Sequence, residues 1–399
     1  MVTRVSSCIA FTYIFIALLF PYFKLGGVVI PSLVFSYIFP VLYFFKKINF
    51  DSEDRYLFLL CLIGAVIAIF VGFISDSKFS LRIVFVYLFA PFIFLSAKIF
   101  VVFCIKKNIS STNIYSIVVN VIFVNSLFVL LLNLNVINAD LFYSVIHTNP
   151  LVFDYPITRY PGFAYDAFSY LSVLNAFGLC LLLQLHLSSK LDISVSFIIK
   201  FVIIMAAMIF TGRAGILVIV LFTLYQSINF VYKKPRLVLA LLTMTSLSLF
   251  ISWGEYDWLK DWAFGFIFNF INGNKVVDSS VTGVMSMIFI PDNVIIGDEI
   301  NFLSVQSDLG FVRVFSSLGF LGLFHMFTFF LLIFFSAIKY NNTFLLFLVL
   351  TIFMLNFKDI YLVSPYGHTF LMFLVLYVGK LMDRNNVVSV KLNNKGDYA

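Results

Sequence analysis

The chain has 399 residues, of which 62% are hydrophobic and only 11% are charged. Soluble domains usually have about 25% charged and about 45–50% apolar residues, so this composition excludes an ordinary water-soluble fold. The net charge of +7 is divided among short basic clusters between apolar runs, such as Lys46-Lys47 and Lys106-Lys107. This distribution is typical of membrane-protein loops and argues against nucleic-acid binding.

Apolar runs long enough to cross a bilayer, about 20 residues, recur along the chain. In chain order, about twelve runs are predicted to be transmembrane helices, with ranges 8–23, 27–45, 56–74, 81–104, 113–133, 165–187, 194–211, 214–231, 236–252, 309–337, 343–357 and 366–382. No small-residue cleavage site follows the first run, so we interpret it as an uncleaved span. The sequence therefore predicts an all-α fold, a polytopic transmembrane helical bundle in a single domain, 1–382, with a polar tail, 383–399, predicted to be disordered.

The basic residues predict how the bundle is oriented. Roughly two thirds of the 26 Lys and Arg fall on the side that holds the N-terminus, so both termini and the tail are predicted to be cytoplasmic. Two connections on the opposite side, about 134–164 and 253–308, are far longer than the usual loop of about 4–6 residues. Because loops carry much of protein function, these two large periplasmic loops predict an extracytoplasmic working face.

Three arginines on the predicted outer side lie close to glycines. The segments that hold them are Arg159-Tyr160-Pro161-Gly162-Phe163, Thr211-Gly212-Arg213-Ala214-Gly215 and Ser307-Asp308-Leu309-Gly310-Phe311-Val312-Arg313. A guanidinium group is always charged and binds phosphate through two parallel hydrogen bonds. The arginines therefore predict a clamp for a lipid-linked diphosphate, and arginines that merely reach lipid headgroups are the alternative.

Carboxylates beside these arginines are candidates for proton transfer. Asp308 precedes a predicted span, and a carboxylate there could accept the proton of a sugar hydroxyl. Asp166 opens another span, where capping or a favourable position at a helix start explains it equally well. Tyr160 could stack on a sugar face. No Cys or His spacing suggests a metal site.

With these segments in this order, the chain resembles the O-antigen polymerases of the Wzy type. These polymerases are inner-membrane enzymes of Gram-negative bacteria. The resemblance covers the pattern of about twelve spans with two large outer loops. It also covers the arginine segments and the later pair Ile296-Gly297 and Ser317-Leu318-Gly319-Phe320-Leu321-Gly322.

The resemblance implies a membrane glycosyltransferase of lipopolysaccharide biosynthesis that is metal-independent, inverting and free of cofactors. Such an enzyme moves an undecaprenyl-diphosphate-linked glycan chain onto a lipid-linked repeat unit at the periplasmic face. By analogy, Asp308, Arg313 and Arg213 are expected to be catalytic. The expected substrate-binding residues are Arg159, Arg213, Arg313, Tyr160 and Asp166. The expected partners are the lipid-linked oligosaccharide and membrane lipids, and a chain-length regulator protein stays open.

Two alternatives remain. O-antigen ligases, which move the finished chain onto lipid A core, show a His-Asn pair where this chain has Ser307-Asp308. A lipid-linked-oligosaccharide flippase should carry charges buried in its spans and have only short loops. We expect the spans of this chain to be nearly free of charge, and two of its loops are long, so the sequence favours a polymerase.

Overall fold

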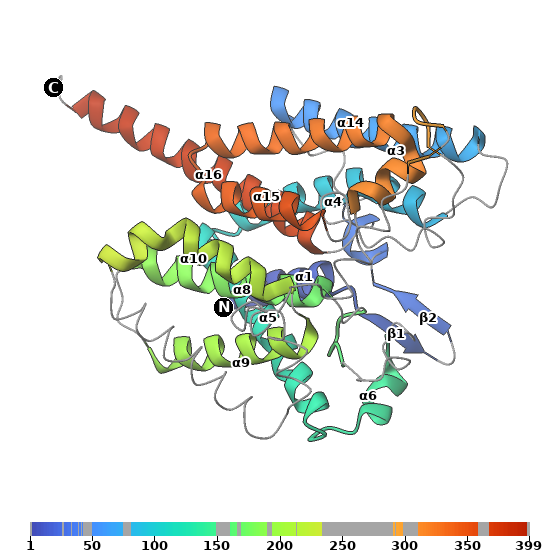
Figure 1. Cartoon of the computed structure of the whole chain (residues 1–399). Helices are drawn as coiled ribbons and strands as arrows, with labels where there is room; N and C mark the ends of the chain where they lie inside the picture. Colours follow the sequence, from blue (N-terminus) through green and yellow to red (C-terminus); the bar gives the residue numbers. More distant parts are fainter. Residues whose placement is uncertain are drawn as a thin grey trace, which may run out of the picture. The chain divides into compact units, whose positions relative to one another are not determined.

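The fold is known from a computed structural model, shown in Figure 1. The described residues are 2–25, 28–32, 34–38, 40, 42, 50–74, 81–148, 160–165, 169–189, 194–212, 214–233, 290–291, 293–297, 310–357 and 367–396. The chain divides into two compact units. Unit 1 consists of Met1–Phe20, Pro31–Ile117 and Met287–Ala399, and unit 2 consists of Pro21–Ile30 and Val118–Ser286.

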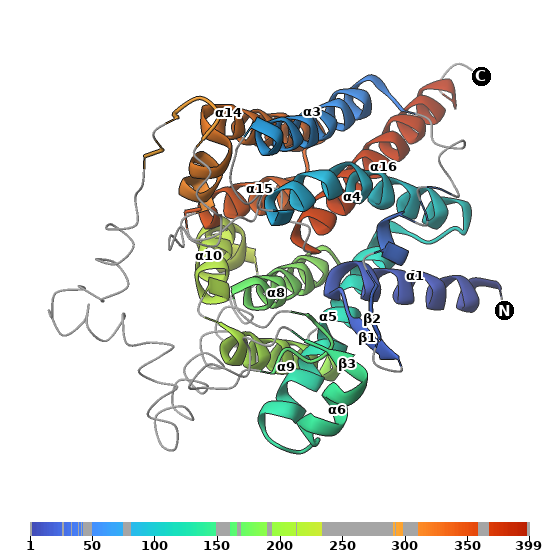
Figure 2. The ribbon, with the colours of Figure 1, turned by 90° about the vertical axis from the view of Figure 1, so that its right-hand side faces the viewer.

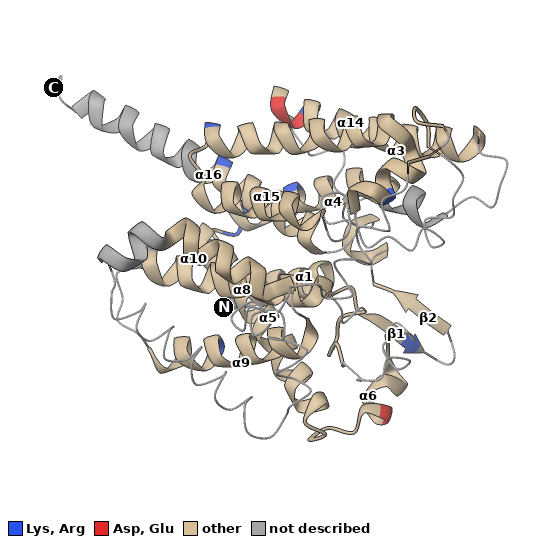
Figure 3. Cartoon of the chain, in the orientation of Figure 1, with Lys and Arg blue, Asp and Glu red and all other residues tan. Residues whose placement is uncertain are grey.

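Long apolar helices make up most of the described chain. They are α1 (Val2–Leu19), α3 (Ser52–Ile74), α4 (Leu81–Lys106), α5 (Ser111–Asn133), α8 (Ser169–Ser189), α9 (Val195–Thr211), α10 (Ala214–Lys233), α14 (Gly310–Lys339), α15 (Thr343–Leu355) and α16 (Gly367–Gly396). Five described segments, in α3, α4, α5, α8 and α14, are long and apolar enough to cross a membrane. Positions of Lys, Arg, Asp and Glu make up little of these ribbons (Figure 3). The mainly helical, membrane-embedded character is confirmed, whereas the number of spans stays a prediction and 236–252 lies outside the described residues.

In unit 1, α3 packs against α4 and α14, and α16 packs against α4 and α15. Aromatic side chains fill the space between them. The ring of Phe373 on α16 lies 5.1 Å from that of Phe94 on α4 and 5.8 Å from that of Phe329 on α14, edge to face in both pairs. All three rings are fully buried, so large apolar side chains hold the helices of this unit together.

In unit 2, α8 packs against both α9 and α10. A three-stranded sheet in the order β2-β1-β3 lies beside the short helix α6 (Ala139–Val145), as Figure 2 shows. Its strands are β1 (Tyr22–Leu25), β2 (Val28–Pro31) and β3 (Ile146–His147), and Tyr22 pairs with His147. This pairing joins the segment after α1 to the first long loop, and both are predicted to be extracytoplasmic.

His147 gives the small sheet a titratable side chain. Burial and then the positive charge of Lys24 lower the pKa of His147 below its usual value. The Lys24 ammonium is held nearby, because it donates a hydrogen bond to the carbonyl oxygen of Tyr143 at 2.9 Å. His147 is therefore neutral at neutral pH.

The second predicted span, 27–45, is wrong in its described part. Residues 28–31 form strand β2, and a short π-helix, η1, covers Val34–Ile38. The β-branched run Val28-Val29-Ile30 favours a strand, and Pro31 and Pro40 interrupt a regular helix. The prediction of a disordered tail is also wrong in part, because α16 continues to Gly396.

Candidate functional site

The predicted site residues are only partly within the described structure. Arg313 lies in the first turn of α14, and Tyr160 begins the described segment 160–165. Arg159, Asp166, Arg213 and Asp308 lie outside the described residues. The backbone next to Arg159 and on both sides of Arg213 is described, and both places belong to unit 2.

Two asparagines of α5 hold the backbone that follows Arg159. The side-chain amide of Asn133 donates to the Tyr160 carbonyl oxygen at 3.1 Å and accepts the Tyr160 N–H at 3.2 Å. Asn125 does the same two residues later, since its Oδ1 accepts the Phe163 N–H at 2.8 Å and its Nδ2 donates to the Pro161 carbonyl oxygen at 3.3 Å. A buried amide paired on both edges fixes a loop backbone, so this segment is anchored to α5.

Gly162 allows the loop to lie this close to α5. Its φ is +67°, and a Cβ there would lie 2.7 Å from Oδ1 of Asn125. The ring of Tyr160 stacks on that of Tyr143 at 5.8 Å, next to buried Leu132 and Ile146. The described contacts of Tyr160 are thus structural, and its expected contact with a sugar stays a prediction.

The turn that contains Arg213 has the geometry that the sequence predicts. Helix α9 ends at Thr211 and α10 begins at Ala214, so the connection is short. Ser172 on α8, fully buried, joins both of its sides. Its hydroxyl donates to the Gly212 carbonyl oxygen at 2.6 Å and accepts the Gly215 N–H at 3.0 Å. One hydroxyl group thus fixes the backbone before and after Arg213.

The anchors of the two arginine segments are themselves linked. Asn175 lies one turn after Ser172 on α8, and its Oδ1 accepts a hydrogen bond from the hydroxyl of Ser126 at 3.3 Å. Ser126 is the neighbour of Asn125 on α5. Polar side chains of one pair of helices, α5 and α8, therefore hold both the segment after Arg159 and the turn around Arg213.

Replacing Ser172 with alanine is expected to lower the free energy of unfolding by about 1–3 kcal/mol, because it leaves the buried Gly215 N–H without an acceptor. Thermal unfolding of the purified protein in detergent would measure this loss. Thr223→Ala on α10 is the matched control, since it removes an exposed hydroxyl that bonds only its own helix. Equal unfolding temperatures for the two variants would contradict the bracing role of Ser172.

Arg313 lies in a helix that is broken in its middle. Gly319 has φ 60° and ψ −156° inside α14, so nine residues from Gly310 to Leu318 precede the break. Residues 293–297 pack against it, with the Phe320 N–H donating to the Val294 carbonyl oxygen at 2.8 Å. A Cβ on Gly297 would lie 2.8 Å from the backbone nitrogen of Gly319. The two glycine motifs that the sequence showed separately thus meet backbone to backbone in unit 1.

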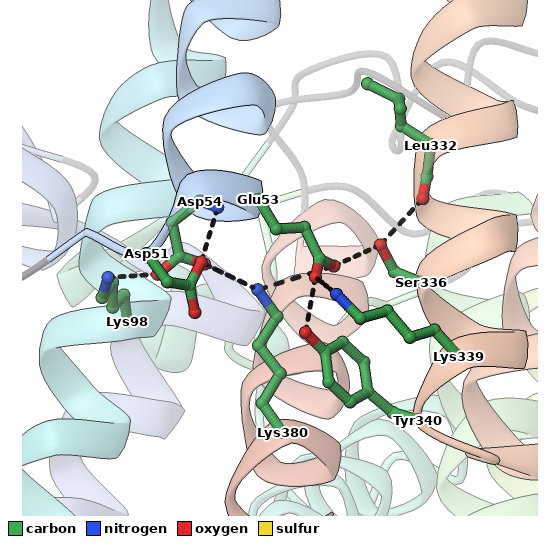
Figure 4. A network of polar contacts seen from close by, with 9 residues as sticks. All are labelled: Asp51, Glu53, Asp54, Lys98, Leu332, Ser336, Lys339, Tyr340 and Lys380. Atoms are coloured by element: carbon green, nitrogen blue, oxygen red, sulfur yellow. Dashed lines mark hydrogen bonds and ion pairs between the residues drawn. The ribbon is translucent and has the colours of Figure 1, made fainter.

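A group of charged side chains in unit 1, buried at its centre, is the main feature that the sequence did not predict (Figure 4). The start of α3 supplies three carboxylates, and three other helices supply one lysine each. These six residues, here called the charge cluster, are Asp51, Glu53, Asp54, Lys98, Lys339 and Lys380. Asp54 forms ion pairs with Lys98 and, at 2.7 Å, with Lys380, and these three side chains are 3%, 8% and 6% exposed.

Lys380 is the centre of the charge cluster. Its ammonium lies 2.7 Å from Asp54, 3.6 Å from Glu53 and 3.7 Å from Asp51. Glu53 in turn accepts hydrogen bonds from two groups of α14, the Ser336 hydroxyl at 2.5 Å and the Lys339 ammonium at 2.9 Å, and from the hydroxyl of Tyr340, which follows α14. Three positive charges thus face three negative ones.

Two groups at the edge of the charge cluster have shifted pKa values. Burial acts to raise the pKa of Asp51, but the Asp54 N–H and the charges of Lys380 and Lys98 outweigh it, so this pKa lies below its usual value. Burial first, and then the hydrogen bond to Glu53, raise the pKa of Tyr340. At neutral pH, Asp51 is therefore ionised and Tyr340 is a hydrogen-bond donor.

A signal for the charge cluster was present in the sequence. Asp51, Glu53 and Asp54 stand directly before a predicted span, whereas Lys98 and Lys380 fall inside two others. The interpretation that the spans are nearly free of charge is therefore wrong for α4 and α16. Residues more than 40 positions apart form the pairs, with separations of 44 for Lys98–Asp54 and 326 for Lys380–Asp54, so local patterns do not reveal them.

The described residues contain no group of three His, Cys, Asp or Glu side chains placed to hold a metal ion. No protein-family model matches the chain, and no curated protein matches it.

Proposed function

We propose that the chain is an O-antigen polymerase of the Wzy type in the inner membrane of a Gram-negative bacterium. One observation supports this proposal most. Polar side chains of α5 and α8 fix the backbone beside Arg159 and on both sides of Arg213. A fixed backbone sets the point from which an arginine side chain extends, and electrostatic catalysis needs charges that are placed in advance.

The proposed reaction is glycosyl transfer with inversion at the anomeric carbon of the donor. The acceptor hydroxyl oxygen attacks that carbon and forms the new C–O bond, while the bond to the diphosphate breaks. The electron pair leaves with the diphosphate, and the hydroxyl proton passes to Asp308. Arg159, Arg213 and Arg313 bind the diphosphate oxygens, where negative charge grows, and guanidinium groups are suited to this because they bind phosphate in a two-point manner.

A second candidate function, a flippase for lipid-linked oligosaccharides, is favoured by the charge cluster. Ionisable residues within membrane spans are rare, and they often mark substrate or ion pathways. Lys98 and Lys380 are such residues, since both are buried in unit 1. The two long loops favour the polymerase, because a flippase needs only short connections.

The surface glycan of cells that lack the chain separates these functions. For a polymerase, the lipid A core should carry a single repeat unit. Absence of any repeat on the core, with lipid-linked polymer accumulating, would indicate a ligase. Accumulation of unflipped carrier on the cytoplasmic face would indicate a flippase. The last two outcomes would overturn the polymerase proposal.

Arg213→Lys is expected to lower the rate of polymerisation by roughly 100-fold or more, because lysine keeps the charge but loses the planar fork that binds two phosphate oxygens. The length distribution of the surface glycan, at matched protein abundance, measures this effect. Arg55→Lys on α3 is the control, since Arg55 is exposed and belongs to the predicted cytoplasmic side. Normal polymerisation by the Arg213 variant would remove this residue from the proposed clamp.

A further inference from the structure

Burying the charged side chains of the charge cluster costs free energy, so a role in stability alone does not account for them. Taking charges out of water costs free energy that pairing often only balances, and apolar residues of similar volume frequently serve a protein equally well. Charges within membrane spans cost more still. The packing of unit 1 already rests on large aromatic side chains, such as Phe94, Phe329 and Phe373. A purely structural clamp at this place could therefore be apolar.

The arrangement of partners gives the charge cluster a second property. The Lys380 ammonium lies within 4 Å of all three carboxylates of the α3 start. It can therefore move from one carboxylate to another without losing all its partners. Each carboxylate also keeps a partner when Lys380 withdraws: Asp54 has Lys98, Glu53 has Lys339, and Asp51 accepts the Asp54 N–H at 2.8 Å. Such exchange avoids the large penalty of an unpaired buried charge.

The charge cluster also has a defined place in the unit. It joins the first turn of α3 to α4, α14 and α16, so four helices are held at one point (Figure 4). On α14, Lys339 of the charge cluster follows Gly319, whereas Arg313 precedes Gly319. The second segment of α14, Phe320–Lys339, is about 30 Å long and can cross a bilayer by itself. Arg313 and the charge cluster therefore lie at opposite ends of α14.

We propose that the charge cluster is an ion-pair lock that keeps the cytoplasmic end of unit 1 closed and opens when Lys380 changes its carboxylate partner. This inference is independent of the polymerase proposal. It rests on the four helices held at one point and on the three carboxylates within reach of one ammonium.

The thiol of the native residue Cys61 can be used to detect opening of the lock. Cys61 lies on α3 seven residues after Asp54, hence on the same face two turns further along, and is 1% exposed. The test uses full-length protein in which Cys8, Cys104 and Cys180 are replaced by serine or alanine, in oriented membrane vesicles. A membrane-impermeant maleimide is applied to inside-out and to right-side-out vesicles. With the native charge cluster, Cys61 should react slowly from either side.

Lys380→Met is expected to raise the labelling rate of Cys61 at least about tenfold in inside-out vesicles and to leave it unchanged in right-side-out ones, because local opening exposes the thiol. Lys339→Met is the matched control. Its side chain is 63% exposed and pairs with Glu53 at the surface, so the rate should stay within about twofold.

The lock is refuted if Lys380→Met reacts at the native rate while its unfolding temperature stays close to that of the native chain, because the charge cluster is then a static clamp. Labelling only from the opposite side also refutes it. If Lys380→Met does not accumulate, Glu53→Gln takes its place, since this change keeps both Asp54 ion pairs. The rate in inside-out vesicles must then rise about threefold, and an unchanged rate rejects the proposal.

Discussion

Replacing Asp54 with asparagine is expected to lower the free energy of unfolding by about 3–5 kcal/mol, the usual cost of removing one partner from a buried ion pair. The change leaves Lys98 and Lys380 with their charges but without the carboxylate that contacts both. Unfolding of the purified protein by denaturing detergent in mixed micelles would measure the loss. The abundance of the variant in membranes should fall in parallel.

Two further variants make this prediction specific. Lys339→Ala removes a pair at the surface and should change the free energy of unfolding by less than about 1 kcal/mol. The triple variant Asp54→Leu, Lys98→Met and Lys380→Met removes the three most buried charges together and should recover most of the lost stability. Of the carboxylates that remain, Glu53 keeps Lys339, and Asp51 is partly exposed and keeps the backbone N–H of residue 54. If the triple variant is as unstable as Asp54→Asn, the cost does not come from orphaned charges.

Replacing Gly319 with alanine is expected to be the second large effect. Its backbone angles are almost exclusive to glycine, and strain of this kind costs about 1–3 kcal/mol. A Cβ there would also overlap the carbonyl group of Ile295 and the amide nitrogen of Gly297. The segment 293–297 must then move away, and the start of α14, with Arg313, loses its support. We expect a lower unfolding temperature together with loss of surface polymer.

Phe320→Ala is the control for the Gly319 variant. Phe320 is the next residue and 59% exposed, so its truncation leaves the contact between Gly297 and Gly319 intact. Near-native unfolding and glycan length are expected for it. A Gly319→Ala protein that unfolds and polymerises normally would show that the break in α14 is not required.

Most of the helices could be predicted from hydropathy because a membrane span must be apolar over its whole length. The predicted runs 56–74, 113–133 and 194–211 match α3, α5 and α9 within a few residues. The run 27–45 failed because hydropathy counts Val28, Val29 and Ile30 as membrane residues without registering their preference for strands. The sheet also depends on a distant strand, because β1, the neighbour of β2, pairs with β3 at His147.

The candidate site could be predicted only at the level of short segments. The tight turn around Arg213 was visible because two glycines stand between two apolar runs. The side chains that fix the backbone of these segments could not be predicted, since Ser172 and Asn125 resemble any small polar residue of a membrane helix. Ser172 and Asn125 take this role through hydrogen bonds to residues 40 and 38 positions away. The charge cluster escaped for the same reason, because lysines near span ends usually indicate only orientation.

The pairing of β1 with β3 has a consequence for the order of events during synthesis. Lys24 beside Tyr22 contacts Tyr143 across 119 residues of chain. At about 5–20 residues per second, a ribosome needs roughly 6–24 seconds to make that stretch. During this interval β1 has emerged without β3, and its edge is free to pair with another nascent chain. Insertion of α3, α4 and α5 thus precedes closure of the sheet, and slower translation of this stretch should increase misassembly.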